Sequence, residues 1–299
     1  MTDTDERPTP VPPPASTVPV AIVTGASSGI GRAAALAFGA KGFHVVLVAR
    51  GAELLADAAA ATLAAGAASA EAAPADVLDA EAIDAIFDAA ARRHGRLDVV
   101  VHAAMVMAYG TVEDLRLEVL DRVMDTATHG TVRVSRAALR HFRAQGRGSL
   151  VIVTSLLGSV AVPGIGAYVT GKWAQVGLSR ILRLETADAP DIHVSTVAPG
   201  AVDTPIYRRA ASVEGHPGKP PPPVDPPEKV AAAIVRASEH GSRRVSVGPL
   251  NAVVVFGFRF ATPVYERLVG PLYRRFALER RTVEPNDGNV FAPSDPEVR

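Results

Sequence analysis

Residues 19–31 read PVAIVTGASSGIG, and the pattern of this stretch indicates the fold of the chain. An apolar run that ends at Thr24 predicts a buried strand, and the glycine-rich segment after it leads directly into a helical pattern. Gly25 would permit a tight turn, Gly29 would let the backbone approach a pyrophosphate, and Gly31 would allow close helix–strand packing. An isolated glycine turn can serve packing alone. Between a strand and a helix, whose first N–H groups attract phosphate, it predicts dinucleotide binding.

The rest of the chain alternates between short apolar strands and alanine-rich helices. Further strands are predicted at residues 44–49, 68–73, 99–103, 150–154, 193–197 and 244–247. Helices, with apolar residues at three- and four-residue spacing, are predicted at residues 30–40, 53–65, 80–93, 113–145, 167–187 and 228–239. This alternation predicts an α/β, doubly wound parallel sheet with helices on both faces.

Four segments are expected along the chain. Residues 1–17 are rich in proline and charge and predict a disordered tail, and residues 18–250 form the Rossmann domain. Residues 251–281 mix aromatics with arginines and predict an amphipathic helical extension, and residues 282–299 predict an extended tail. Packing or oligomer contact is the favoured role of the extension, and peripheral membrane contact is the alternative.

Composition excludes several classes of protein. The 31 basic and 31 acidic residues balance, so nothing predicts a nucleic-acid partner. The chain has no cysteine, which excludes disulfides and thiolate catalysis, and its histidines lack metal-ligand spacing, so no metal site is predicted. The N-terminus lacks the order of a signal peptide and no apolar run reaches the length of a membrane span, so we expect a soluble, cytoplasmic protein.

Three residues form a candidate proton-transfer group. Tyr168 and Lys172 are four residues apart on a predicted helix and share one face, and Ser155 ends a strand. Hydride transfer between a nicotinamide and a carbonyl carbon needs a proton donor or acceptor at the oxygen. Lowering a tyrosine pKa by about three units takes roughly 4 kcal/mol, which one ammonium at ~4 Å can supply. We therefore expect Lys172 to lower the pKa of Tyr168.

These motifs resemble the short-chain dehydrogenases/reductases over roughly residues 18–250. The resemblance rests on TGASSGIG at residues 24–31, Asp76 and Val77, Ser155, Tyr168-x-x-x-Lys172, and Pro199 and Gly200 followed by Thr204. It implies a Rossmann-like sheet of about seven strands, a catalytic group of Ser155, Tyr168 and Lys172, and a homodimer or homotetramer. It also implies that the Ala104 backbone contacts the adenosine ribose and that Thr204 binds the nicotinamide carboxamide.

The predicted cofactor is NADP(H) rather than NAD(H). The second strand ends without the carboxylate that would bind a ribose 2′-hydroxyl, and Arg50 at its end can pair with a 2′-phosphate, although a solvated arginine is the alternative. Ser27, Ser28 or Arg32 would assist. Asp76 would bind the adenine or cap the next helix. The full predicted set is Gly25, Ser27, Ser28, Gly29, Ile30, Gly31, Arg50, Asp76, Val77, Ala104, Tyr168, Lys172, Pro199, Gly200, Val202 and Thr204.

The chain departs from the family pattern at two places. Residues 102–105 read HAAM where the family has N-N-A-G, and Ala127 stands where the family has an asparagine that is thought to hold a water beside the lysine. Thr126, Thr128 or His129 could hold that water, turnover could be slow, or the protein could bind cofactor without useful catalysis. The two hypotheses are an NADP(H)-dependent oxidoreductase and a nucleotide-binding sensor or scaffold.

The substrate side of the predicted site is apolar. Ligands of open α/β sheets lie beyond the carboxyl ends of the strands, which predicts a lining of Met105, Leu157, Val162, Ile206 and Tyr207. No lysine or arginine there is committed to a carboxylate or phosphate. A hydrophobic ketone or secondary alcohol is the predicted substrate, and residues 203–227, which include a proline-rich irregular loop at 215–227, are expected to close over it.

Overall fold

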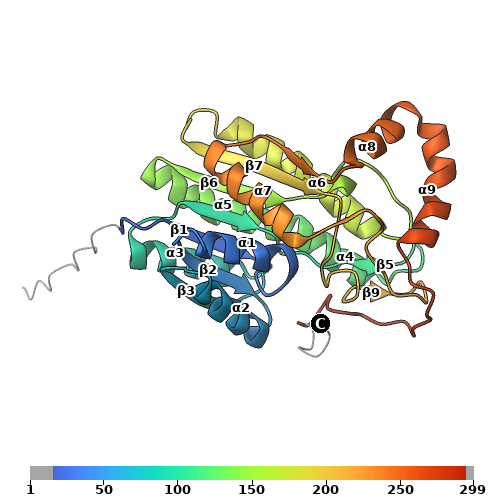
Figure 1. The fold of residues 1–299 in the computed structure, drawn as a ribbon, viewed down its shortest axis with the longest axis horizontal. Coiled ribbons are helices and arrows are strands. Elements are labelled where there is room, and N and C mark those ends of the chain that lie inside the picture. Colours follow the sequence, from blue (N-terminus) through green and yellow to red (C-terminus); the bar gives the residue numbers. More distant parts are fainter. Residues whose placement is uncertain (1–15, 294–299) are drawn as a thin grey trace, which may run out of the picture.

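A seven-stranded parallel β-sheet runs through the centre of the computed structural model, which describes residues 16–293 (Figure 1). The order across the sheet is β3 (Ser69–Pro74), β2 (His44–Ala49), β1 (Val20–Thr24), β4 (Val99–His102), β6 (Gly148–Val153), β7 (Ile192–Pro199) and β11 (Val245–Val247). All neighbouring strands are parallel. The predicted doubly wound, Rossmann-like sheet is therefore confirmed, and its strand order reverses between β1 and β4.

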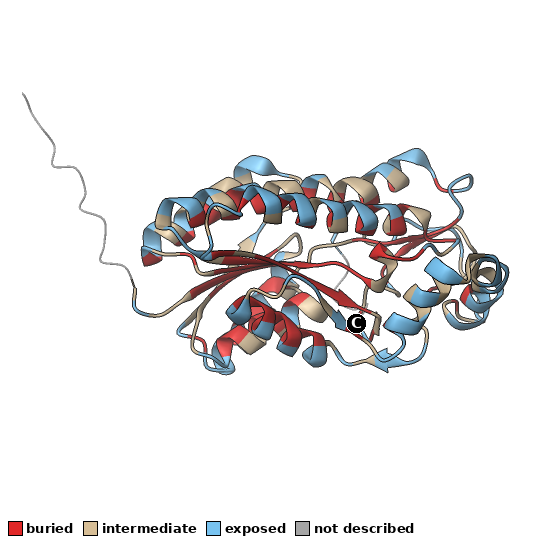
Figure 2. Ribbon diagram, turned by 90° about the horizontal axis from the view of Figure 1, so that it is seen from above, coloured by how far each residue is buried: buried red, intermediate tan, exposed pale blue. Residues whose placement is uncertain are grey.

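Both faces of the central strands are covered by helices, which explains why β1 and β2 are almost entirely apolar and buried. In β1, Ala21 and Val23 belong to one apolar core and Val20 and Ile22 to the other, because successive side chains point to opposite faces. Figure 2 shows the buried strands as a layer between two layers of helices that are buried only on their inner sides.

The helices divide between the two faces. The first face is covered by α1 (Gly29–Gly39), α2 (Ala52–Ala64) and α7 (Pro227–His240). The second face is covered by α3 (Ala80–His94), α5 (His129–Gln145) and α6 (Gly166–Glu185), and α4 (Leu117–Ala127) packs against α5 and α6. This arrangement leaves the carboxyl ends of the strands open to a ligand.

The single helix predicted over residues 113–145 is wrong, because the chain turns at Thr128 between α4 and α5. Thr128 has φ −94° and ψ −70°, and its hydroxyl donates to the Met124 carbonyl at 2.8 Å. The turn lets Gly130 lie against Val77, where an added Cβ would come within 2.8 Å of Val77 Cγ2. The apolar periodicity of the sequence continues through both helices, so it could not predict the contact between Gly130 and Val77 or the break that goes with it.

Two helices follow β11 and form an arch that projects from the body, as Figure 1 shows. They are α8 (Asn251–Phe260) and α9 (Thr262–Phe276), separated at Ala261, which has φ −125° and ψ 41°. Both lie within residues 251–281, where an amphipathic helical extension is predicted. Among residues 16–293, no helix is long and apolar enough to cross a membrane.

Residues 277–293, the described part of the chain after α9, form no helix or strand but pack on the body. Asn286 and Ser212 exchange backbone hydrogen bonds, and Val290 is fully buried. At the other end, residues 1–15 of the tail expected at residues 1–17 lie outside the described residues, and the Ser16 N–H donates to the His94 carbonyl at 2.8 Å. Both termini of the described chain are thus tied to the domain.

Two short ladders shape the carboxyl edge of the sheet. β5 (Ala108–Tyr109) pairs with β9 (Ala211–Ser212), and β8 (Ala201–Val202) pairs with β10 (Val224–Asp225). The second ladder places the otherwise irregular, proline-rich loop against the strand that follows Gly200. The ladders hold the loop over residues 203–227 beside the segment after β4.

A substitution at Gly31 tests the close packing of the turn between β1 and α1, because a Cβ there would lie 2.2 Å from the Gly25 carbonyl oxygen. We expect Gly31→Ala to destabilise the protein by about 1–3 kcal/mol through overpacking. At this chain length each kcal/mol lowers Tm by roughly 2–4 °C, which thermal unfolding would measure.

Gly177→Ala is the matched control for this variant. Gly177 also lies within a helix, but nothing is within 4 Å of its added Cβ. Alanine there should leave Tm unchanged or raise it, because alanine is the better helix former. Equal Tm values for the two variants would contradict the close-packing role of Gly31.

Candidate active site

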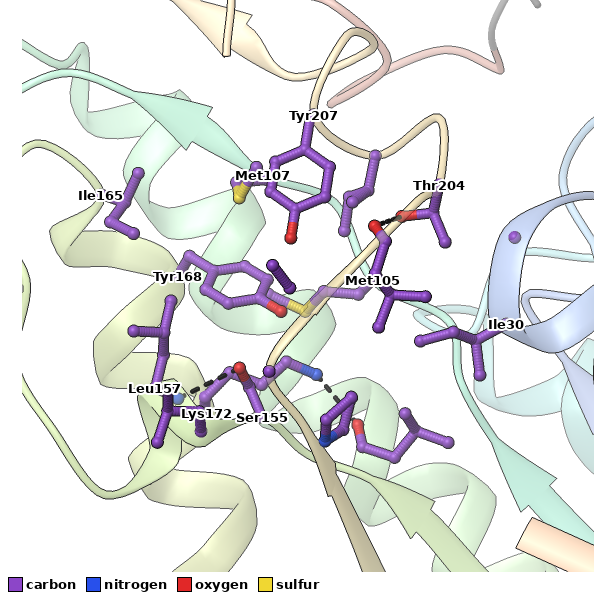
Figure 3. A pocket seen from close by; sticks show the side chains of 18 of the residues that line it. Ile30, Met105, Met107, Ser155, Leu157, Ile165, Tyr168, Lys172, Thr204 and Tyr207 are labelled. Atoms are coloured by element: carbon purple, nitrogen blue, oxygen red, sulfur yellow. Dashed lines mark hydrogen bonds between the residues drawn. The ribbon is translucent and has the colours of Figure 1, made fainter. Parts of the chain in front are cut away.

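One cavity of about 790 Å³ lies at the carboxyl ends of the strands and is lined by the full predicted cofactor set, the predicted substrate lining and the candidate catalytic group. On the cofactor side these are Gly25, Ser27, Ser28, Gly29, Ile30, Gly31, Arg50, Asp76, Val77, Ala104, Pro199, Gly200, Val202 and Thr204. On the substrate side they are Met105, Leu157, Val162, Ile206 and Tyr207, beside Ser155, Tyr168 and Lys172. Arg32 does not line it. Figure 3 shows Tyr168, Ser155 and Tyr207 pointing into this cavity.

Ser155, Tyr168 and Lys172 come together from two elements. Ser155 follows β6, and its Oγ accepts a hydrogen bond from the Leu157 N–H at 3.1 Å. Tyr168 and Lys172 lie one turn apart on α6, with Lys172 Nζ 5.4 Å from the centre of the Tyr168 ring. The Ser155 hydroxyl lies near the Tyr168 phenol (Figure 3). The end of β6 and the first turns of α6 therefore present one polar cluster.

Burial dominates the ionisation of this cluster. It raises the pKa of Tyr168 well above its usual value, the neighbouring Tyr207 raises it further, and the nearby Ser155 hydroxyl lowers it by less. Burial also lowers the pKa of Lys172 to about 7. The expectation that Lys172 lowers the pKa of Tyr168 is wrong for the protein alone, because desolvation disfavours both charged forms. The phenol is protonated at neutral pH.

A buried chain of hydrogen bonds holds Lys172. Its Nζ donates to the Val153 carbonyl at 3.0 Å and to Gln175 Oε1 at 2.9 Å. Gln175 Nε2 donates to Thr131 Oγ1 at 2.9 Å, and Thr131 Oγ1 donates to the Ala127 carbonyl at 2.5 Å. All four side chains are buried. Sequence reasoning missed Gln175, although its place three residues after Lys172 puts it on the same helix face.

The side chains expected to replace the family asparagine are engaged elsewhere. Thr126 Oγ1 donates to the Arg122 carbonyl and Thr128 Oγ1 to the Met124 carbonyl, each at 2.8 Å. His129 pairs with Asp125 and is largely exposed. Ala127 is fully buried against Gly171, where an added Cβ would approach Ala127 Cβ to 2.5 Å. In the described chain, Gln175 is the side chain that accepts from Lys172.

His102 connects the ends of β1 and β4. Its Nδ1 lies 2.9 Å from Thr24 Oγ1, which also accepts from the Ala103 and Ala104 N–H groups at 3.3 and 3.4 Å. Burial, and secondly the charge of Lys172, lower the pKa of His102 to about 3. His102 is thus a neutral structural residue where the family pattern has asparagine.

The backbone around the glycine turn can hold a dinucleotide. Gly25 has φ +70°, and a Cβ there would lie 2.7 Å from the Ala104 nitrogen, so only glycine permits this approach of β1 to the turn after β4. Gly29 has φ +53° and faces Thr204, whose Cγ2 would lie 3.0 Å from an added Cβ. Ser28 is the N-cap of α1, so the positive end of that helix faces the cavity.

Arg50 is engaged by the C-terminal segment. It donates through Nη1 to the Val290 carbonyl at 2.9 Å and through Nη2 to the carbonyls of Asn289 and Ala292. Burial lowers its pKa despite the nearby Asp76. In this arrangement Arg50 is neither a solvated loop arginine nor a guanidinium that is free to bind a phosphate. Its contact with Val290 joins residues that are 240 positions apart, and the sequence alone does not reveal it.

Asp76 is also partnered within the protein. It accepts from the Leu78 N–H at 2.9 Å and pairs with Arg122. The N-cap of α3 is Asp79, whose side chain accepts from the Ala82 N–H, so the capping role considered for Asp76 is wrong. Among residues 16–293, no cluster of three or more histidine or carboxylate side chains could hold a metal ion.

The chain is similar to known oxidoreductases over most of its length. The uncharacterized oxidoreductase YxnA of Bacillus subtilis is 34% identical over 246 residues, which cover 81% of this chain and 68% of that protein. The putative oxidoreductase SadH of Mycobacterium tuberculosis is 32% identical over 268 residues, which cover 86% and 96%.

A solved structure supports the same grouping. The alcohol dehydrogenase of the archaeon Thermococcus sibiricus, complexed with 5-hydroxy-NADP, aligns with a TM-score of 0.67 at 28% identity, covering 77% of this chain and 96% of that one. The family profile described as short chain dehydrogenase matches residues 19–214. With the parallel sheet, the glycine turn and the Ser–Tyr–Lys cluster, these similarities show that the chain belongs to the short-chain dehydrogenase family of oxidoreductases.

Proposed function

We propose that this protein is an NADP(H)-dependent reductase that converts hydrophobic ketones to secondary alcohols and also catalyses the reverse oxidation. The observation that carries the proposal is the cluster of Tyr168, Ser155 and Lys172, with Lys172 Nζ 5.4 Å from the Tyr168 ring centre, in a cavity that also contains the glycine turn. A phenol whose pKa is raised by burial is suited to donate a proton, which favours carbonyl reduction at neutral pH.

The chemistry that a bound reduced nicotinamide supplies is hydride transfer to the carbonyl carbon. The residues that would hold the dinucleotide are the turn from Gly25 to Gly31 at the pyrophosphate, and Pro199, Gly200, Val202 and Thr204 at the nicotinamide. The Ser155 hydroxyl would donate a hydrogen bond to the carbonyl oxygen and hold it near Tyr168. The Tyr168 hydroxyl would give that oxygen its proton, and solvent would later restore the phenol.

Lys172 would stabilise the tyrosinate that proton donation leaves behind. Its ammonium has three N–H groups, of which two are used by the Val153 carbonyl and by Gln175. The third is available to the phenolate or to the cofactor ribose. We propose that Gln175 positions Lys172 where the family asparagine is replaced by Ala127.

A preference for NADP(H) is supported by the end of β2. No carboxylate there would bind a ribose 2′-hydroxyl, and Arg50 lines the cavity. A phosphate makes charge-assisted hydrogen bonds that are about twice as strong as neutral ones, so a 2′-phosphate would displace the carbonyls of Asn289 and Val290 from the arginine. The negative charge of Asp76 is already paired with Arg122, so Asp76 would repel a 2′-phosphate less than an unpaired carboxylate would.

Self-association is part of the proposal, as the family resemblance implies. Three large apolar side chains on the outer surfaces of α4 and α6 are more than half exposed: Leu117, Ile181 and Leu184. A homodimer or homotetramer would cover them. Within the described residues no feature favours a nucleic-acid or metal partner.

The second candidate function is a nucleotide-binding sensor or scaffold with weak turnover. It is favoured by the enclosure of Lys172, because Gln175, Thr131 and Ala127 beside it are all buried. Tight NADPH binding without reduction of any ketone would favour this candidate.

Tyr168→Phe separates the two candidates. We expect reduction of hydrophobic ketones, followed by NADPH oxidation, to fall by about 10²–10⁴-fold in kcat, because the proton donor is lost. NADPH binding, measured by fluorescence, should persist. Tyr109→Phe removes a hydroxyl from the same cavity and should retain turnover. Equal activities of wild type and Tyr168→Phe would contradict the role of Tyr168.

The pKa of Lys172 predicts the pH dependence of reduction. Because its folded pKa is lowered to about 7, Lys172 is charged below that pH, and kcat should fall as the pH rises through about 7. Gln175→Glu adds a negative charge and should move this break to higher pH, and Gln175→Leu removes an acceptor and should move it lower. A purely structural role of Gln175 would reduce kcat and leave the break in place.

Arg50→Ala tests the cofactor preference. Loss of a charge-assisted contact of about 1.5–3 kcal/mol should raise the Kd for NADPH by roughly 10- to 100-fold and leave the Kd for NADH nearly unchanged. Arg32→Ala is the control, because Arg32 is close in sequence to the glycine turn but does not line the cavity. Unchanged NADPH affinity in Arg50→Ala would show that the 2′-phosphate binds elsewhere or is not selected.

A further inference from the structure

An apolar stripe on α9 faces the catalytic cavity and is largely exposed. Val264, Leu268, Leu272 and Phe276 follow one another at four-residue spacing, which places them on one face of the helix. They line the cavity, yet their side chains are 59%, 50%, 50% and 39% exposed. At 1.5 Å per residue the stripe is about 18 Å long. Contiguous exposed apolar surface of this kind marks a binding site.

The arch that carries the stripe is fixed to the body at several points. The Tyr265 hydroxyl donates to the Ala161 carbonyl at 2.8 Å, and the Tyr273 hydroxyl donates to the Gly164 carbonyl at 3.3 Å. At the base of α8, Asn251 Nδ2 donates to the carbonyls of Ala198 and Val247. Phe258 packs edge-on against both Trp173 and Tyr265. The stripe therefore belongs to a supported wall.

Two of these anchors lie on the face of α9 next to the stripe. Tyr265 and Tyr273 are eight residues apart and share a face that packs on the segment 160–165, which also carries Val162 of the predicted substrate lining. The stripe is the adjacent face, turned toward the same cavity as Tyr168. Arg259, Arg267, Arg274 and Arg275 belong to the arch but do not line the cavity. The stripe therefore presents apolar side chains along its whole length to a ligand in the cavity.

We propose that the inner face of α9 binds the hydrocarbon part of an elongated substrate, so that the substrate class is ketones or secondary alcohols with a long aliphatic portion. This inference rests on the proposed function, since the carbonyl end must reach Ser155 and Tyr168. The stripe continues from the catalytic cavity outward, and it is far longer than a short-chain ketone requires. Burying the chain against the stripe removes apolar surface of both partners from water.

A chain-length series of methyl ketones, from 2-butanone to 2-undecanone, tests this inference through kcat/KM with NADPH. In the wild type each added methylene should raise kcat/KM by up to about fourfold until the stripe is covered. The double variant Leu268→Ser with Leu272→Ser should reduce the ratio of kcat/KM for 2-undecanone to that for 2-butanone by at least about tenfold. A flat series in the wild type would overturn the inference.

The control is Phe256→Ser with Phe260→Ser. Both phenylalanines belong to the same arch and are exposed, but neither lines the cavity. This variant should keep the wild-type dependence on chain length. If it loses that dependence and the Leu268 and Leu272 variant keeps it, the outer face binds the apolar ligand and the inference is wrong.

Binding measured without turnover keeps the inference separate from the proposed function. Displacement of the fluorescent apolar probe 1-anilinonaphthalene-8-sulfonate by 2-undecanone should be strong in the wild type and weak in the Leu268 and Leu272 variant. If no ketone is reduced but this difference holds, the reductase proposal fails and the hydrocarbon site stands. Equal displacement in the two proteins would overturn the site, whatever the activity.

Discussion

The candidate site depends on the close approach of the carboxyl ends of strands β1 and β4. Gly25 lies so near the backbone of Ala103 and Ala104 that a Cβ would overlap it, and Gly31 packs as tightly on Gly25. Thr24 and His102 close the contact with a buried hydrogen bond. Because strand order reverses between these two strands, the approach defines the edge of the sheet at which the glycine turn, Ser155 and α6 meet.

Desolvation governs the chemistry at that edge. A lysine and a tyrosine taken out of water both favour their neutral forms, so the protein holds a protonated phenol beside a lysine that is charged only part of the time near pH 7. The cost of burying the ammonium is offset by hydrogen bonds to Val153 and Gln175. Gln175 in turn is satisfied by Thr131, so loss of the family asparagine does not leave Lys172 without a polar partner.

Segments that are remote in sequence complete both ends of the cavity. The segment around Val290 engages Arg50 beside the predicted adenosine region, and α9 extends the substrate region outward with an apolar stripe. Both come from the last fifty residues of the chain, after the sheet is finished. The end of β6 and the start of α6 supply the candidate reacting groups, and the C-terminal region shapes what surrounds them.

The sequence by itself determined the parallel sheet, the glycine turn and the Ser155, Tyr168 and Lys172 cluster, because apolar periodicity and short motifs are local properties that parallel strands bring to one edge. The break between α4 and α5 at Thr128, the hydrogen bond from Lys172 to Gln175 and the contacts of Arg50 became visible only in the tertiary structure. Each depends on side chains from separate elements, or on how far burial excludes water. Local pattern does not encode burial, so it could name Tyr168 and Lys172 but could not give the direction of their pKa shifts.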